Sequence, residues 1–184
     1  MQIRKVILFL VIFMVDNSRT KGQIYFTKNG SISFFSKTIL QNIQADNNEV
    51  ISILNLQTGS LQFSLLNTAF HFTKAKMEED FNENYMESDK YPRSTFKGSI
   101  SNINKIDFSK DGTWLVNVTG DLTIHGVTKN ITTSGKITIK DGKISATSSF
   151  KILLEDYHIK IPSIVSNKIS ENIEITINCN YEKK

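Results

Sequence analysis

Histidine is the side chain in this sequence best suited to acid–base catalysis or metal binding, and the chain has three: His71, His125 and His158. Metal sites commonly place two ligands on one element, as in His-x-His, because such a pair sets the geometry. Here each histidine stands alone in the sequence. His125, in "GDLTIHGVTKN" at 120–130, follows a strand-like run and precedes a glycine. We therefore interpret it as a turn residue held by nearby threonines, and we expect no metal site.

Other patterns that could support catalysis are weaker. Cys179 is the only cysteine and lies on the apolar side of an alternating run, where a thiolate is unfavourable. The sequence has no Gly-x-Ser-x-Gly elbow, and the acidic residues of 78–83 have the spacing of a solvated helix face. Asp156 is interpreted as a turn or strand-end cap. We thus predict neither catalytic residues nor a cofactor, with a metal- or histidine-dependent enzyme using the three histidines as the alternative.

In the segments that would position these side chains, apolar and polar residues alternate with a period of two, which indicates half-buried strands. Two runs show it most clearly, one beginning at Trp114 and one ending at Tyr181. The members on the apolar faces of these runs are Trp114, Val116, Val118, Gly120, Leu122 and Ile124, and then Ile173, Ile175, Ile177, Cys179 and Tyr181.

Turn signals separate the strands at short intervals. Asp141-Gly142 stands between two alternating runs and predicts a two-residue hairpin. Asp111-Gly112 repeats the signal, and Gly59 marks a further hairpin. This spacing, with only two prolines in the chain, favours an antiparallel meander over parallel βαβ units.

One segment, at 75–86, has helical rather than strand spacing, through Met77, Phe81 and Tyr85, and Pro92 prevents its continuation. A sheet of antiparallel strands must protect its edges, and closure into a barrel does so; about eight strands leave room for side chains and one ligand. We therefore predict an all-β fold: a closed antiparallel barrel of about eight strands, with one helix at its mouth.

The N-terminus has the pattern of a secretory signal peptide. Arg4 and Lys5 precede an apolar run at 6–15, which is too short to cross a bilayer as a helix of roughly 20 residues. We predict a signal peptide at 1–22, cleaved after Gly22, and one domain at 23–184; a membrane anchor is the alternative. The segment carries four basic residues against one acidic, so its removal would lower the net charge from +4 to +1. We expect no nucleic-acid partner and a periplasmic or secreted location in a bacterium.

Three longer segments, taken in combination, resemble a known family of proteins: "GDLTIHGVTKNI" at 120–131, "FNENYMESDKYPRSTFKGSI" at 81–100 and "SFKILLEDYHIKIPSIVSNKISENIEITI" at 149–177. In this combination the sequence resembles the YceI family of exported proteins, over nearly all of 23–184. The resemblance implies a lipocalin-like barrel that holds a long apolar molecule, such as a polyisoprenoid or a fatty-acid derivative. It implies no catalytic residue set, since a fold alone does not determine function.

The apolar residues of the chain suit such a ligand. We expect the pocket to be lined by Phe81, Met86, Phe96, Trp114 and Phe150. The partner would be an isoprenoid or acyl chain, and a homodimer and a transient membrane contact stay open. The third alternative is a structural or stress-related exported barrel filled by its own side chains.

Overall fold

The protein is a β-barrel, seen in a computed structural model that describes residues 23–184. The predicted signal peptide at 1–22 and its cleavage site lie outside the described residues. The strands of the described part are β1 (Ile24–Lys37), β2 (Asn42–Asn55), β3 (Ser60–Leu66), β4 (His71–Phe72), β5 (Arg93–Ile100), β6 (Gly112–Ile124), β7 (Val127–Lys140), β8 (Lys143–Leu153) and β9 (Asn172–Lys183). Its short helices are η1 (Asn67–Ala69), α1 (Ala75–Asp80), η2 (Phe81–Tyr85), η3 (Ile103–Lys105), η4 (Glu155–Tyr157) and η5 (Ser163–Val165). None of the helices between residues 23 and 184 has the length and apolar character needed to cross a membrane.

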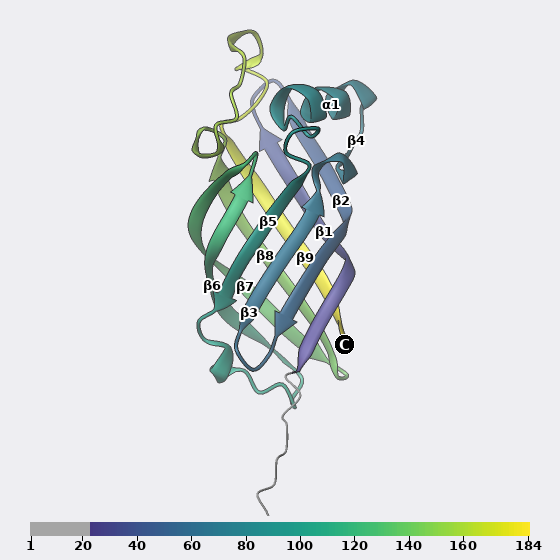
Figure 1. Ribbon diagram of the computed structural model, residues 1–184, viewed down its shortest axis with the longest axis vertical. Coiled ribbons are helices and arrows are strands. Elements are labelled where there is room, and N and C mark those ends of the chain that lie inside the picture. Colours follow the sequence, from purple (N-terminus) through teal and green to yellow (C-terminus); the bar gives the residue numbers. More distant parts are fainter. Residues whose placement is uncertain (1–22) are drawn as a thin grey trace, which may run out of the picture.

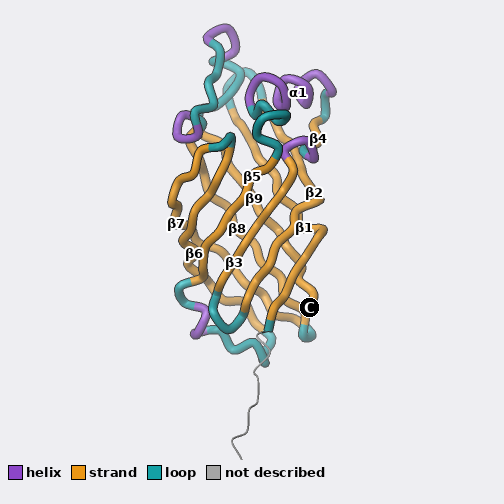
Figure 2. Tube along the Cα trace, viewed as in Figure 1, coloured by secondary structure: helices purple, strands orange, loops and turns teal. Residues whose placement is uncertain are grey.

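All the longer strands take part in one closed ring (Figure 1, Figure 2). Their hydrogen-bonded order is β1-β9-β8-β7-β6-β5-β3-β2, and β1 also pairs with β2 to close the ring. The two-residue strand β4 pairs with β2 through Ala45 and Phe72. Closure satisfies the backbone groups that an open sheet would leave at its edges. The predicted closed antiparallel barrel of about eight strands is therefore confirmed.

Tight turns join neighbouring strands at both ends of the barrel. Asp141 and Gly142 connect β7 to β8 with φ values of 51° and 73°, as a two-residue turn of this kind requires. His125 and Gly126 connect β6 to β7 in the same way, with φ values of 50° and 73°. Both findings agree with the turns predicted from the sequence.

The hairpin predicted at Asp111-Gly112 is wrong. β5 ends at Ile100 and β6 begins at Gly112, so Asp111 is the last residue of a longer connection that contains η3. The Asp111 carboxylate accepts the backbone N–H of Asp141 at 3.1 and 3.2 Å, which ties this connection to the β7–β8 turn. The Asp-Gly pair therefore serves a contact between two loops.

The two ends of the barrel differ. One end, called here the closed end, carries the turns at 56–59 and 141–142 and the connection 101–111. It is packed with buried apolar residues such as Ile103, Ile106 and Ile144. The other end, called the mouth, carries the turn 38–41, segment 67–92, the turn 125–126 and segment 154–171 (Figure 1). The helix predicted at the mouth lies there as α1, and the chain continues as a π-helical turn, η2.

Candidate functional site

An apolar cavity of about 340 Å³ occupies the barrel interior. Each of the eight long strands contributes inward-facing side chains to its wall, and α1 and η2 contribute Met77, Phe81 and Tyr85 at the mouth. Several inward-facing wall residues, such as Ile175 and Ile177 of β9, are only half-buried because they border this space. The barrel is thus not filled by its own side chains, contrary to the filled-barrel alternative.

Four phenylalanines gather under the helix at the mouth. Phe81 of η2 stacks on Phe34 of β1, with ring centroids 5.4 Å apart, and lies 5.6 Å from Phe70 and 5.1 Å from Phe72. Aromatic pairs at these spacings contribute about 0.5–1.5 kcal/mol each beyond the area they bury. Since all four rings line the cavity, the cluster both fastens the helix to the barrel and forms the apolar collar of the mouth.

Four of the five residues predicted for the pocket line the cavity: Phe81, Met86, Phe96 and Phe150. They belong to different secondary-structure elements and lie at different heights along the barrel axis. Met86 follows η2 and is buried with Ile124, Tyr157 and Ile159. Phe96 of β5 lies in the core near Phe63, with ring centroids 6.3 Å apart.

Trp114 lies elsewhere: the structure does not place it among the residues that line the cavity. It stands near the start of β6, at the closed end, opposite Ile137 of β7. Its indole covers Gly112, where an added Cβ would lie 2.8 Å from the Trp114 ring, and it packs against the core of that end. Strand alternation predicted the face of this side chain but not its height along the barrel, and β6 extends beyond the cavity.

The closed end of the cavity carries one buried polar pair. Tyr181 lines the cavity, and its hydroxyl lies 2.7 Å from the hydroxyl of Ser52, which is fully buried. Burial raises the pKa of Tyr181 and raises the pKa of the neighbouring Cys179 thiol to about 12. Both groups are therefore neutral at physiological pH and suit an apolar interior. As predicted, Cys179 is a buried thiol on the inward face.

Backbone pairing between β7 and β8 covers only part of the two strands. The two strands pair only from Gly135↔Ser148 to Lys140↔Lys143, so Val127 to Ser134 on β7 have no partner on β8. At the upper limit of the pairing, the Ser148 hydroxyl donates to the Ser134 carbonyl at 2.8 Å. Lys136 and Thr147, an exposed cross-strand pair, line the cavity there. Above this point the unpaired part of β7 packs against η4, with Val127 against the buried cluster that contains Tyr157.

Asn67 holds the chain at the mouth in place. Its side chain is fully buried, its amide donates to the Tyr91 carbonyl at 2.6 Å, and its carbonyl accepts from the Ser94 hydroxyl at 2.8 Å. Both partners lie where the segment after the helix enters β5. A buried amide with both ends satisfied is a structural group, and it positions segment 67–92 over the cavity.

The three histidines are not brought together. His71 of β4 is exposed, with Nδ1 3.7 Å from a Glu78 carboxylate oxygen. His158 ends η4 in a left-handed conformation, with φ of 57°. His125 lies between Glu87 and the backbone of Tyr157. Among residues 23–184 no cluster of three or more His, Cys, Asp or Glu side chains has the geometry to hold a metal ion.

The most informative residues that sequence reasoning missed are Phe34, Asn67 and Glu87. Phe34 follows period two on β1 and could have been assigned to the inward face. Asn67 and Glu87 carry no local signal, because their roles depend on partners at Tyr91, Ser94 and His125.

Comparisons with known proteins agree with this architecture. A family model described as the YceI-like domain matches residues 14–181. A polyisoprenoid binding domain from Saccharophagus degradans, implicated in plant cell wall breakdown, superposes with a TM-score of 0.78 at 15% identity, over 89% of this chain and 100% of that one. BcnA from Burkholderia cenocepacia gives a TM-score of 0.68 at 14% identity, over 83% and 96% of the two chains.

A Campylobacter jejuni YceI protein gives a TM-score of 0.56 at 21% identity, over 73% of this chain and 80% of that one. At such identities the likeness to solved structures shows a common fold. No curated protein matches the sequence at a significant level.

Proposed function

The chain belongs to the family of YceI-like domains, whose model covers most of its length, and on this premise we propose that it is an exported protein that binds an apolar molecule in its barrel. The ligand is a polyisoprenoid or a fatty-acid-like chain. The activity is sequestration rather than catalysis: the barrel shields the chain from water, and a polar head group stays in solvent at the mouth. The observation that carries this proposal is the unfilled apolar cavity of about 340 Å³.

The size and lining of the cavity support an apolar chain. Ligand pockets in proteins commonly measure about 300–1,000 Å³ and combine apolar walls with a few polar groups. Burial of roughly 400 Å² of ligand surface, at about 25 cal/mol per Å², gains about 10 kcal/mol before entropy is subtracted. Micromolar binding needs about 8 kcal/mol. Because association costs at least about 4 kcal/mol, a chain that buries roughly 500 Å² or more has this driving force.

Similarity gives the proposal a second support. The structural neighbour from Saccharophagus degradans is described as a polyisoprenoid binding domain and is matched over its whole length. The location is also part of the proposal: the basic, apolar and small residues of 1–22 have the order of a secretory signal, which supports a location in the periplasm or outside the cell.

Native mass spectrometry of gently purified protein tests the proposal, followed by organic extraction of bound material and by titration with a fluorescent acyl probe. We expect a bound apolar molecule, or saturable micromolar uptake of the probe. The same spectra report whether the chain is a monomer or a homodimer. A protein that carries nothing and takes up no probe would refute the carrier function.

A pair of matched variants makes the test specific to the cavity. Ile177 borders the cavity on β9, whereas Leu115 of β6 is 71% exposed on the outer wall. Ile177→Trp fills part of the cavity and is expected to lower probe affinity at least about tenfold, by displacing buried ligand surface. Leu115→Trp adds the same ring outside and is expected to leave affinity unchanged. Equal affinities in the two variants would locate binding outside the barrel.

A further inference from the structure

Three large apolar side chains are exposed on two loops at the mouth. Ile39 and Leu40, in the turn between β1 and β2, are 103% and 64% exposed, and Ile164 of η5 is 85% exposed. A lone exposed leucine on a protein surface is ordinary, but clustered exposed apolar residues commonly mark a contact surface. We refer to Ile39, Leu40 and Ile164 as the apolar rim.

The two loops that carry the rim are neighbours. The backbone N–H of Ser170, just before β9, donates to the Ser36 hydroxyl at 2.9 Å, at the end of β1. β1 and β9 also pair at Phe35 and Glu174, directly below the loops. The rim therefore lies at the mouth, the end of the barrel that also carries α1 and η2 (Figure 1).

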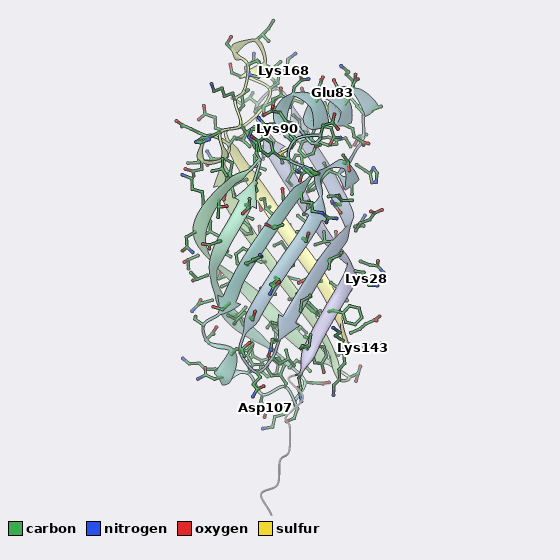
Figure 3. All side chains as sticks on the ribbon, in the orientation of Figure 1. Lys28, Glu83, Lys90, Asp107, Lys143 and Lys168 are labelled. Carbon is green, nitrogen blue, oxygen red and sulfur yellow. The ribbon has the colours of Figure 1, made fainter. Side chains whose placement is uncertain are left out.

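The charged side chains nearest to the rim in the sequence are lysines. Residues 34–45 and 157–170 contain three lysines, Lys37, Lys160 and Lys168, and no aspartate or glutamate. All three lysines are exposed, and within residues 23–184 none of them takes part in an ion pair. The acidic residues at this end lie farther from the rim along the chain: Glu155, Asp156 and Glu171 at the two ends of segment 154–171, and Glu83 on η2, which Figure 3 shows with Lys168 on its separate loop.

The rim also borders the entrance to the cavity. Gln41, next to Leu40, and Val165, next to Ile164, line the cavity, as does Lys168. A surface that contacts the rim would therefore lie against the open end of the cavity.

We propose that the apolar rim docks on a membrane surface that contains anionic phospholipid. Ile39, Leu40 and Ile164 would enter the headgroup region, where apolar side chains gain from burial, and the three lysines would contact lipid phosphates. The mouth would then face the bilayer, so an apolar chain could pass between bilayer and barrel without crossing water. This exchange role rests on the proposed carrier function, whereas the docking itself does not.

Charge favours a membrane over a second copy of the chain. A two-fold dimer brings the same patch of both copies together, so Lys37, Lys160 and Lys168 of one copy would face the same lysines of the other. An anionic lipid surface pairs with these charges instead, and each lysine near such a surface strengthens binding severalfold.

Vesicle flotation tests the docking. The closed barrel lies wholly within residues 23–184, so this segment is used, which keeps the apolar run at 6–15 out of the measurement. We expect it to float with vesicles of phosphatidylcholine and phosphatidylglycerol, to bind much less to phosphatidylcholine alone, and to be released by salt. Binding to neither vesicle, or equal binding to both, would overturn the proposal.

Rim variants locate the contact. The double variant Ile39→Asp with Ile164→Asp is expected to lower binding to the mixed vesicles at least about tenfold, and Lys168→Glu about fivefold or more. The control Leu115→Asp places the same charge on an equally exposed apolar residue of the outer wall and is expected to bind as wild type. Unchanged binding of the rim variant, or a rim-dependent dimer in its place, would refute the membrane contact.

Probe uptake in vesicle-free buffer separates this proposal from the carrier function. The double variant Ile39→Asp with Ile164→Asp should take up the acyl probe as well as wild type, because neither side chain lines the cavity. Rim-dependent flotation by a protein that takes up no probe would leave the docking standing and the carrier function refuted.

Discussion

His125 Nε2 lies 2.7 Å from a carboxylate oxygen of Glu87, although 38 residues separate the two in the sequence. The same ring places Nδ1 3.1 Å from the carbonyl oxygen of Tyr157 and packs edge-on against Tyr91, with ring centroids 4.6 Å apart. His125 thus joins the β6–β7 turn to the segment after the helix and to η4. The stretch "GDLTIHGVTKN" forms a structural turn at the mouth, as predicted. The predicted partners are wrong: Glu87 and Tyr157 hold His125, whereas the nearby Thr123 and Thr128 hydroxyls pair with each other.

Loss of the His125 joint should destabilise the barrel. His125→Ala removes both hydrogen bonds of a side chain that is 10% exposed, and should lower the free energy of unfolding by about 1–3 kcal/mol in urea denaturation. His125→Asn is the control, because asparagine tolerates the positive φ of this turn and retains one polar group. It should lose less stability. Equal stability of the alanine variant and wild type would show that the joint does not contribute.

Gly98 and Gly120 face each other across β5 and β6, and neither position has room for a side chain. A Cβ on Gly98 would lie 2.6 Å from Phe96 Cζ and 2.8 Å from Gly120 Cα, and would also meet the Thr119 carbonyl oxygen. Gly98→Ala should therefore lower the free energy of unfolding by about 1–3 kcal/mol or more through overpacking. Gly142→Ala has nothing within 4 Å but a positive φ of 73°, and should lose about 1 kcal/mol. Thermal denaturation of both variants checks the order, and a larger loss at Gly142 would contradict it.

Substitutions at Phe150 and Trp114 should distinguish a residue that contacts the ligand from one that only stabilises the fold. Phe150→Ala removes a half-buried ring from the cavity wall and should weaken acyl-probe binding about tenfold, since the ring covers ligand surface. Trp114→Ala should lower the free energy of unfolding by about 3 kcal/mol, as an aromatic truncation in a core does, and leave probe affinity within about twofold. Fluorescence titration of each folded variant with the acyl probe measures the two affinities. A larger affinity loss at Trp114 would place the ligand deeper than the cavity extends.

Alkaline pH should destabilise the protein through its buried acids. Burial raises the pKa of Cys179 from 9.0 to about 12 and that of Tyr157 from 10.0 to about 12, and it also raises the pKa of Tyr181. Above about pH 9 the unfolded chain loses protons that the folded chain keeps, so the free energy of unfolding falls as pH rises toward about 12. Urea midpoints measured across this range should fall progressively. Cys179→Ala should reduce the slope, and an identical slope would show that Cys179 does not contribute.

The faces of the strands could be predicted from the sequence because alternation is a local property of extended chain. Several features follow from residues close in sequence. They are the inward positions of β6 and β9, the turns at His125-Gly126 and Asp141-Gly142, and the helical segment that contains Phe81. Closure of the sheet into a barrel was predicted because the sequence has no parallel-sheet signals and because strand edges need protection. These features determined the fold class and the apolar character of the interior.

Heights along the barrel, and pairs made between distant segments, were decided only by tertiary structure. The sequence predicted Trp114 and Phe150 alike as pocket residues, but the register of β6 and β8 places one at the closed end and the other on the cavity wall. The same holds for His125 with Glu87 and for the loops of Ile39 and Ile164. Alternation repeats every two residues and so carries no information on register, which only the closed ring of strands determines.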